Sequence, residues 1–304
     1  MHFDLITILG PTASGKTKIA AVISEKFNCE IISADSRQVY RKMDIGTGKD
    51  LNEFTRRNIK YHLIDIVDPE DEYDLFRFSG DFYDAFSKIK NDSKIPLLVG
   101  GTGLYLSSIL QNYVLPTSDF NEEEYEHLST LSNDELKKLL LETKPKLHNT
   151  TDLKDKERII RAIFIERANK KDKNSVKKIN SLIIGTDLNR ELIKKKITGR
   201  LKQRLSSGMI DEVKSLLDSG ISQQKLDYFG LEYRYISKYI NGQLNYNDMF
   251  QKLNSAIHNF AKRQMTWFRK MEREGVKIFW FNPDDTDAIL SFIESKMKFY
   301  EHSS

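Results

Sequence analysis

The residues with the clearest chemistry form the run Gly10-Pro11-Thr12-Ala13-Ser14-Gly15-Lys16-Thr17. This run fits the pattern G-x-x-x-x-G-K-[ST] of a phosphate-binding loop, in which backbone N–H groups and a helix N-terminus surround phosphate oxygens. The Lys16 ammonium would neutralise phosphate charge, and the Thr17 hydroxyl would be a ligand for Mg²⁺. The alternative is an ordinary turn. The position of the run between an apolar segment and a helical pattern favours the phosphate loop.

Two further polar segments follow apolar runs that predict strands. Asp35 follows the apolar run 30–33 after one intervening residue. Three roles stay open for it: a magnesium ligand, a general base or a helix N-cap. Thr102 lies in a glycine cluster that follows residues 96–99, a cluster that is also typical of a plain tight turn. Because the carboxyl ends of parallel strands face one edge, we expect Asp35, Thr102 and the phosphate loop to converge there.

The alternation of apolar runs and helical patterns predicts the elements that position these groups. We expect strands at 3–9, 30–33, 61–66, 96–99, 182–185 and 276–280, and helices that include 16–27, 76–90 and 246–272. This order predicts an α/β fold with a doubly wound parallel sheet and helices on both faces. Residues 116–178 are charged and helical in pattern, which predicts a helical insertion in a core made of residues 1–115 and 179–304.

Composition excludes several classes of protein. The 304 residues carry a formal net charge of +4 and are 39% hydrophobic, which is ordinary for a globular chain. No apolar run reaches the roughly 18 to 20 residues of a membrane span. The six histidines have no zinc-ligand spacing, and no G-x-S-x-G elbow of a serine hydrolase follows a strand. With one cysteine and no signal-like segment before the first strand, we expect a cytoplasmic monomer.

Five blocks of the sequence resemble the tRNA dimethylallyltransferase (tRNA isopentenyltransferase) family. They are GPTASGKT at 10–17, DSRQVYRKMDIGTGKD at 35–50, YHLIDIVDPEDEYDLFRF at 61–78, PLLVGGTGLYL at 96–106 and AKRQMTWFR at 261–269. The resemblance implies a phosphate-loop NTPase-like core that transfers a dimethylallyl group from dimethylallyl diphosphate to tRNA. The acceptor would be N6 of adenosine 37 in tRNAs reading codons that begin with U, and the product N6-isopentenyladenosine.

The resemblance also implies roles for the matching residues. The catalytic residues would be Asp35, which accepts the proton or hydrogen bond of the N6 amine, Thr102, near the leaving oxygen, and Lys16. The diphosphate would be held by Gly10, Thr12, Ala13, Ser14, Gly15, Lys16, Thr17 and Arg200, with Mg²⁺ as cofactor at Thr17. The tRNA would be bound by Asp35, Ser36, Arg37, Gln38, Thr102, Arg158, Arg161, Lys262 and Arg263, and its anticodon stem-loop by the insertion 116–178.

Charge and departures from the family pattern leave alternatives open. Cations gather at 194–204 and 262–273, where an RNA partner and solvated helix faces are comparable explanations for the lysines. Residues 46–50, 162–165, 229–233 and 257–264 depart from the usual family sequence, so we hypothesise a competent prenyltransferase with altered RNA recognition. The alternatives are an isopentenyltransferase acting on free adenine nucleotides, a phosphate-loop small-molecule kinase using ATP, and a catalytically silent RNA-binding protein.

Overall fold

The computed structural model describes residues 3–113, 122–143, 156, 159–160, 162–164 and 178–301. A six-stranded sheet in the order β3-β2-β4-β1-β5-β6 forms its centre, and every strand pair is parallel. The strands are β1 (Leu5–Leu9), β2 (Cys29–Ala34), β3 (Tyr61–His62), β4 (Ile95–Gly100), β5 (Ser181–Thr186) and β6 (Phe279–Phe281). Connections between neighbouring parallel strands need crossovers, which explains why helices separate the strands along the chain.

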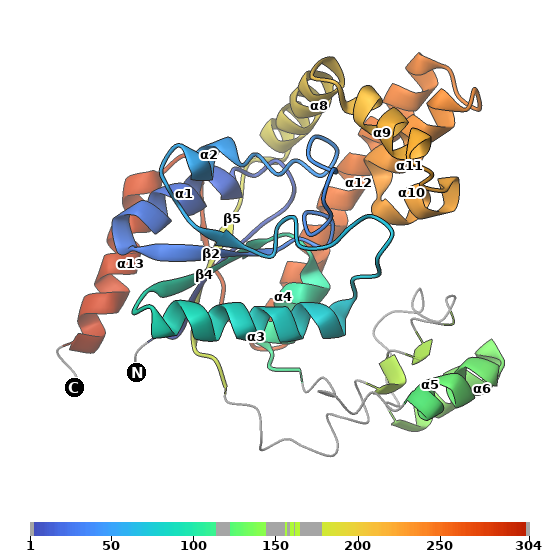
Figure 1. Cartoon of the computed structure of the whole chain (residues 1–304). Coiled ribbons are helices and arrows are strands. Elements are labelled where there is room, and N and C mark those ends of the chain that lie inside the picture. Colours follow the sequence, from blue (N-terminus) through green and yellow to red (C-terminus); the bar gives the residue numbers. More distant parts are fainter. Residues whose placement is uncertain are drawn as a thin grey trace.

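Helices cover both faces of this sheet and form a separate group beside it (Figure 1). They are α1 (Lys16–Phe27), α2 (Asn52–Thr55), α3 (Leu75–Asn91), α4 (Gly103–Leu110), α5 (Glu122–Thr130), α6 (Asn133–Thr143), α8 (Arg190–Ser206), α9 (Met209–Asp218), α10 (Gln223–Phe229), α11 (Leu231–Ile240), α12 (Tyr246–Arg273) and α13 (Thr286–Glu301). The predicted α/β fold with a doubly wound parallel sheet is confirmed.

Two hydrophobic cores fill the two faces of the sheet because successive strand residues point to opposite sides. In β1, Ile6 and Ile8 pack with α1 and α13, whereas Leu5 and Leu9 pack on the other side with α3, α4 and α12. Burial of each such aliphatic side chain stabilises the folded state by about 1.5 to 3 kcal/mol relative to leaving it exposed. The strands that carry the phosphate loop, Asp35 and Thr102 are therefore buried between the two cores.

Two predicted strands differ from those in the structure. The strand expected at 61–66 ends at His62 because Leu63 and Asp65 adopt left-handed backbone angles, with φ of 61° and 57°. The Asp65 carboxylate is then directed toward the buried amine of Lys49. The strand expected at 276–280 is displaced, since β6 begins at Phe279, where the chain pairs with β5.

The helices α5 and α6 lie apart from the sheet, beside the N-terminal end of α3 (Figure 1). They share a small core of their own with Ile159, Ile160, Ile163 and Phe164, and Phe76 of α3 packs against it. A separate core is typical of an insertion. The boundaries 116–178 and the binding of an anticodon stem-loop stay predictions.

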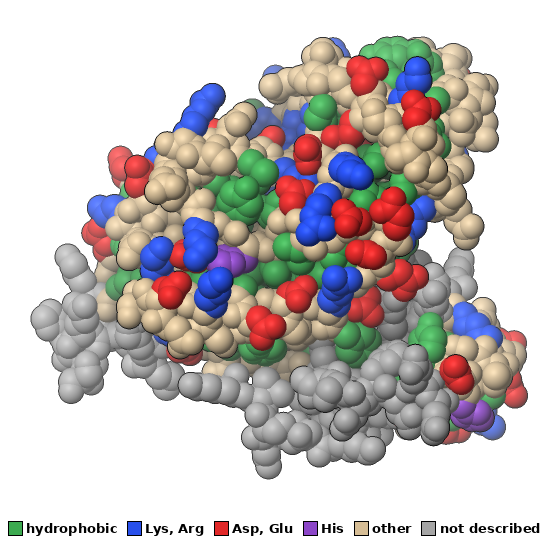
Figure 2. Space-filling model, viewed as in Figure 1, with side chains coloured by type: hydrophobic (Ala, Val, Ile, Leu, Met, Phe, Trp, Pro, Cys, Tyr) green, Lys and Arg blue, Asp and Glu red, His purple; other side chains and the backbone are tan. Residues whose placement is uncertain are grey.

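The surface gives a mixed electrostatic picture. On the face in Figure 2, basic and acidic side chains intermix over the described part of the surface. None of the helices described is long and apolar enough to cross a membrane.

The buried carboxylate of Glu30 in β2 generates a prediction about stability. It accepts hydrogen bonds from Lys94 at 2.8 Å and pairs with His62 at 2.7 Å, with Lys60 at 3.4 Å. Burial acts to raise the pKa of Glu30, but these partners outweigh it and hold the pKa at about 2. Because the folded-state pKa is depressed, the carboxylate stabilises the fold above its ordinary pKa of about 4.3 and stops doing so as pH falls toward 2.

Glu30→Gln is therefore expected to lower the free energy of unfolding by about 2 kcal/mol at neutral pH and by little near pH 2. Urea unfolding across this range measures the difference, with the exposed Glu70→Gln as control. An equal loss at both ends of the range would contradict the ionic role of Glu30.

Candidate active site

The phosphate loop connects β1 to α1 in a conformation that the sequence dictates. Gly10 lies so close to Thr186 of β5 that a Cβ atom would collide with its hydroxyl. Gly15 has a φ of 87° as the N-cap of α1, and Ala13 is also left-handed at 62°. Ser14 is fully buried, and its hydroxyl lies 2.6 Å from that of Thr186. Thr186 of β5 therefore holds the phosphate loop through the Ser14 hydroxyl. Because this hydroxyl is engaged, the predicted contact of Ser14 with diphosphate would be made by its backbone.

Lys16 lies at the first turn of α1 and is strongly perturbed. Its ammonium donates a hydrogen bond to the carbonyl of Pro11 at 2.7 Å, so the side chain folds over the loop. Burial, together with the nearby charge of Arg200, lowers the pKa of Lys16 to about 7, although Asp35 acts in the opposite direction. Burial and a neighbouring cation disfavour the charged form of Lys16, and a bound anion would favour it again. A perturbed lysine of this kind is typical of a functional site.

A cleft of about 570 Å³ opens beside this loop. Its lining residues are Ala13, Ser14, Gly15, Lys16, Thr17, Lys18, Asp50, Asn52, Glu53, Arg56, Lys196, Arg200 and Gln203. Arg200 of α8 reaches it while donating to the carbonyl of Gly48 at 3.3 Å and pairing with Asp50 at 3.1 Å. Six of the eight predicted diphosphate residues thus line one cleft. Gly10 packs against β5 behind it, and Thr12 lines an adjoining small pocket next to Arg200.

Asp35 and Thr102 meet because β2 and β4 are neighbours, with Ala34 opposite Gly100. The Ser36 N–H donates to Thr102 Oγ1 at 3.1 Å, and the Thr102 N–H donates to the Ala34 carbonyl at 3.3 Å. Asp35 Oδ1 accepts the N–H of Arg37 at 2.9 Å. Residues 36–39 form turns, not a helix, so the N-cap role that stayed open for Asp35 is wrong. The carboxylate instead fixes a turn at the sheet edge.

The segment 44–50 closes the site from the side and is held by internal charges that the sequence analysis missed. Glu212 of α9 accepts from three successive N–H groups, those of Asp44, Ile45 and Gly46, at 2.8, 2.7 and 2.9 Å. Tyr233 donates to the same carboxylate at 2.8 Å. The segment is thereby fixed to the helices that follow β5.

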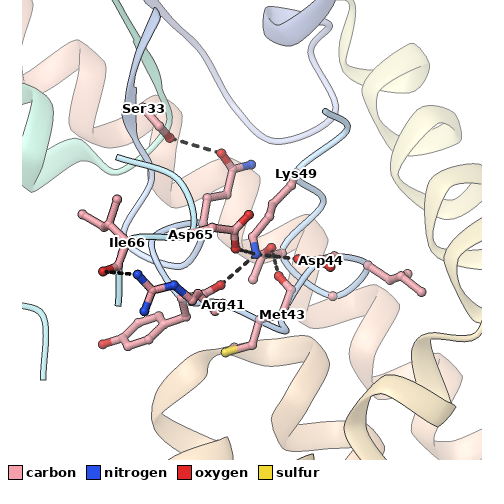
Figure 3. Close-up of polar contacts among 12 residues, drawn as sticks. Ser33, Arg41, Met43, Asp44, Lys49, Asp65 and Ile66 are labelled. Carbon is pink, nitrogen blue, oxygen red and sulfur yellow. Dashed lines mark hydrogen bonds and ion pairs between the residues drawn. The ribbon is translucent and has the colours of Figure 1, made fainter. Parts of the chain in front are cut away.

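Lys49 supports this segment from inside (Figure 3). The amine of Lys49, whose side chain is buried, donates to the Tyr40 carbonyl at 2.7 Å and to Asp44 at 2.6 Å, and pairs with Asp65. Gln38 bridges the segment to the sheet, since it accepts from Ser33 and donates to the Gly48 carbonyl, each at 3.1 Å. Both the oxygen and the nitrogen of the Gln38 amide thus bond to protein groups. The role of Gln38 in tRNA binding stays a prediction.

Comparison with known proteins identifies the family of this chain. The family model described as IPP transferase matches residues 38–271, and that described as isopentenyl transferase matches residues 3–65. A tRNA dimethylallyltransferase 2 of Phocaeicola vulgatus is 50% identical, over 97% of this chain and 99% of that protein. The crystal structure of the tRNA isopentenylpyrophosphate transferase of Bacillus halodurans has a TM-score of 0.72 at 30% identity, covering 98% of both chains. The chain belongs to the IPP transferase family.

Membership of this family makes the chain an isopentenyltransferase and does not favour the kinase alternative. A eukaryotic dimethylallyltransferase acting on tRNA shares the fold, with a TM-score of 0.76 at 23% identity, over 93% of this chain and 74% of that one. The resemblance stated from the sequence blocks is confirmed. The family match extends far beyond the phosphate loop, as the order of the blocks implies.

The remaining predicted tRNA-binding residues of this IPP transferase are distributed over several elements. Arg37 lies beside Asp35 with its guanidinium 4.6 Å from the ring centre of the exposed Tyr228. Lys262 and Arg263 are exposed on α12. Arg158 and Arg161 lie outside the described residues. Arg37, Lys262 and Arg263, the three that the structure describes, lie on different elements, and the contact of all five residues with RNA stays a prediction.

The cations of α8 are largely paired with carboxylates. Lys194 pairs with Glu191 at 2.8 Å, Lys196 with Asp284 at 3.7 Å, and Arg204 lies 3.9 Å from Glu232. Burial lowers the pKa of Arg204 to about 10 and raises that of Glu232. These paired cations therefore brace the α8 side of the cleft, whereas Arg190, Lys195 and Lys202 are exposed on the same helix, so an RNA contact there stays a prediction.

The lowered pKa of Lys16 predicts proton uptake on binding of pyrophosphate. Above pH 7 the amine in the empty loop is largely neutral and must be protonated to meet the anion, so affinity falls by up to about tenfold per pH unit. Calorimetry in two buffers of different ionisation enthalpy measures the proton count. Lys16→Arg, whose guanidinium stays charged, should abolish the uptake and the exposed Lys88→Arg should not. Absence of uptake in the native protein would contradict the depressed pKa.

Proposed function

We propose that this chain transfers a dimethylallyl group from dimethylallyl diphosphate to N6 of adenosine 37 in tRNA. The observation that carries the proposal is the convergence of a phosphate loop, Lys16 and Arg200 with Asp35 and Thr102 at one sheet edge. The names of the relatives support the choice of tRNA as acceptor, since several at about 50% identity over nearly the full length are tRNA dimethylallyltransferases.

The donor side of the reaction would be the cleft beside the phosphate loop. As the bond between the allylic carbon and the diphosphate oxygen breaks, the leaving diphosphate takes the electron pair and gains negative charge. Lys16, Arg200 and the N–H groups at the start of α1 are oriented to stabilise that charge. Thr102 Oγ1 already accepts the Ser36 N–H and so has its own proton to offer the leaving oxygen.

The acceptor side would be Asp35. The N6 amine forms the new bond to the allylic carbon and loses one proton, for which the Asp35 carboxylate is the acceptor. Because Oδ1 of Asp35 is engaged by Arg37, Oδ2 is the oxygen directed to the amine. An adenine in a stem-loop must leave its stack to reach this edge, as bases generally do in enzymes that modify them.

Magnesium is part of this proposal. Thr17 lies in the cleft with its hydroxyl at the start of α1, a donor that suits Mg²⁺. Among the residues described there is no group of three His, Cys, Asp or Glu side chains that could hold a metal. The ion would therefore be bound by Thr17, water and the diphosphate oxygens, and it would neutralise diphosphate charge there. A cytoplasmic monomer completes the proposal.

The decisive experiment is a prenyl transfer assay with labelled dimethylallyl diphosphate and Mg²⁺. An unmodified stem-loop with A36-A37-A38 is offered in one reaction and AMP in another. We expect label on the stem-loop, and Asp35→Asn should lower kcat by about 10² to 10⁴ while the exposed Asp211→Asn does not. Label on AMP alone, ATP hydrolysis without prenyl transfer, or stem-loop binding without product would each contradict the proposal.

The hypothesis of altered RNA recognition has its own test. If the departures at 46–50, 162–165, 229–233 and 257–264 change RNA contacts, kcat/KM on a full tRNA of standard sequence is expected to be well below that of a relative without them. Equal kcat/KM values would contradict this hypothesis and leave the prenyl transfer proposal intact.

A further inference from the structure

Gln264 is a buried polar residue in an otherwise apolar stripe of α12. The buried residues of this 28-residue helix recur at intervals of three and four, and they are Met249, Leu253, Ile257, Ala261, Gln264, Phe268 and Met271. Gln264 is 7% exposed. A buried amide costs free energy unless its hydrogen bonds are made, so a glutamine in this stripe needs a specific set of partners.

Those partners come from two loops of the active site. Gln264 Oε1 accepts the N–H of Thr12 in the phosphate loop at 2.8 Å, and Nε2 donates to the carbonyl of Gly101 at 2.8 Å. The reverse orientation of the amide would place NH₂ against N–H and oxygen against oxygen, so the two contacts fix it. A side chain on Gly101 would lie 2.5 Å from Nε2, which explains a glycine at this position.

The bridge joins the loop that would hold the diphosphate to the loop that carries Thr102. The two loops follow neighbouring strands, since Leu9 of β1 is opposite Gly100 of β4. The sheet fixes where the loops start, but it leaves the path of each beyond its strand undefined. The amide of Gln264 spans that gap with one donor and one acceptor of fixed separation.

We infer that Gln264 is a positioning residue that sets the distance between the diphosphate loop and the Thr102 loop through its bonds to Thr12 and Gly101. Gln264 is buried and is not among the residues that line the cleft, so its effect on the substrates would be exerted through the two loops to which its amide is hydrogen-bonded. Reaction rates depend on the placement of reacting groups to about 1 Å, so its loss is expected to act on kcat. The inference rests on the proposed function for its kinetic test, although not for its binding test.

The test compares Gln264→Leu and Gln264→Glu with Gln251→Leu, on the exposed face of the same helix. Gln264→Leu keeps the volume and loses both bonds, and we expect kcat to fall by about 10 to 100-fold with KM for the stem-loop unchanged. Gln264→Glu accepts from Thr12 but repels the Gly101 carbonyl until it is protonated. Its kcat relative to the native enzyme should therefore rise as pH falls toward the pKa of the buried carboxyl, whereas that of Gln264→Leu should not.

Two results would overturn the inference. One is a kcat per folded molecule of Gln264→Leu equal to that of Gln251→Leu, with only a lower melting temperature, which would make Gln264 a packing residue. The other is a Gln264→Glu profile parallel to that of the native enzyme.

Pyrophosphate affinity separates failure of this inference from failure of the proposed function. If the native protein transfers no prenyl group, the proposed function fails, and Gln264 is still decided by the pyrophosphate Kd. A pyrophosphate Kd that is several-fold higher in Gln264→Leu, but not in Gln251→Leu, supports the positioning role. Equal Kd values in the two leucine variants overturn it.

Discussion

The site depends on the parallel pairing of β2, β4 and β1 at their carboxyl ends. Ala34 is opposite Gly100, and Gly100 is opposite Leu9, so the residues that follow these strands emerge side by side. The approach is so close that a side chain on Gly100 would collide with the backbone of Ala34. Groups that are far apart in sequence thus become neighbours through backbone hydrogen bonds alone, before any side chain orients them.

Charged groups lie on both sides of the segment 44–50. On the side away from the cleft they are compensated by protein partners, and on the cleft side lie the cations Lys16 and Arg200. Asp44 and Asp65 neutralise Lys49 behind the segment 44–50, and Glu212 neutralises three N–H dipoles along it. Arg200 and Lys16 lie on the cleft side, where burial and the charge of Arg200 lower the pKa of Lys16. An anion bound between them favours the charged form of Lys16 again, so the empty site is electrostatically prepared for a diphosphate.

The parts of the site that the sequence predicted are those encoded by local patterns. The phosphate loop is contiguous, Gly15 has a left-handed backbone angle, Gly10 lies against Thr186, and Asp35 and Thr102 each follow a recognisable strand. The supporting contacts of Glu212, Lys49 and Gln264 were not predicted. Lys49 and Gln264 lie in blocks that resemble the family, but such a resemblance does not show which distant groups a side chain contacts. The backbone partners of Glu212 and Gln264 lie more than 160 residues away in sequence. The strand at 61–66 was overextended because the left-handed residues Leu63 and Asp65 leave no trace in hydrophobic periodicity.

The two halves of the chain contribute different things to this site. Residues before 113 supply most of the groups that would meet the substrates, whereas residues after 178 supply supports: Thr186 behind Gly10, Glu212 on the segment 44–50 and Gln264 between two loops. Arg200 belongs to both sets, since it lines the cleft and holds Gly48. A phosphate loop on its own binds many anions. The supports from the second half give it one fixed relation to Asp35 and Thr102, so the site needs both halves of the chain.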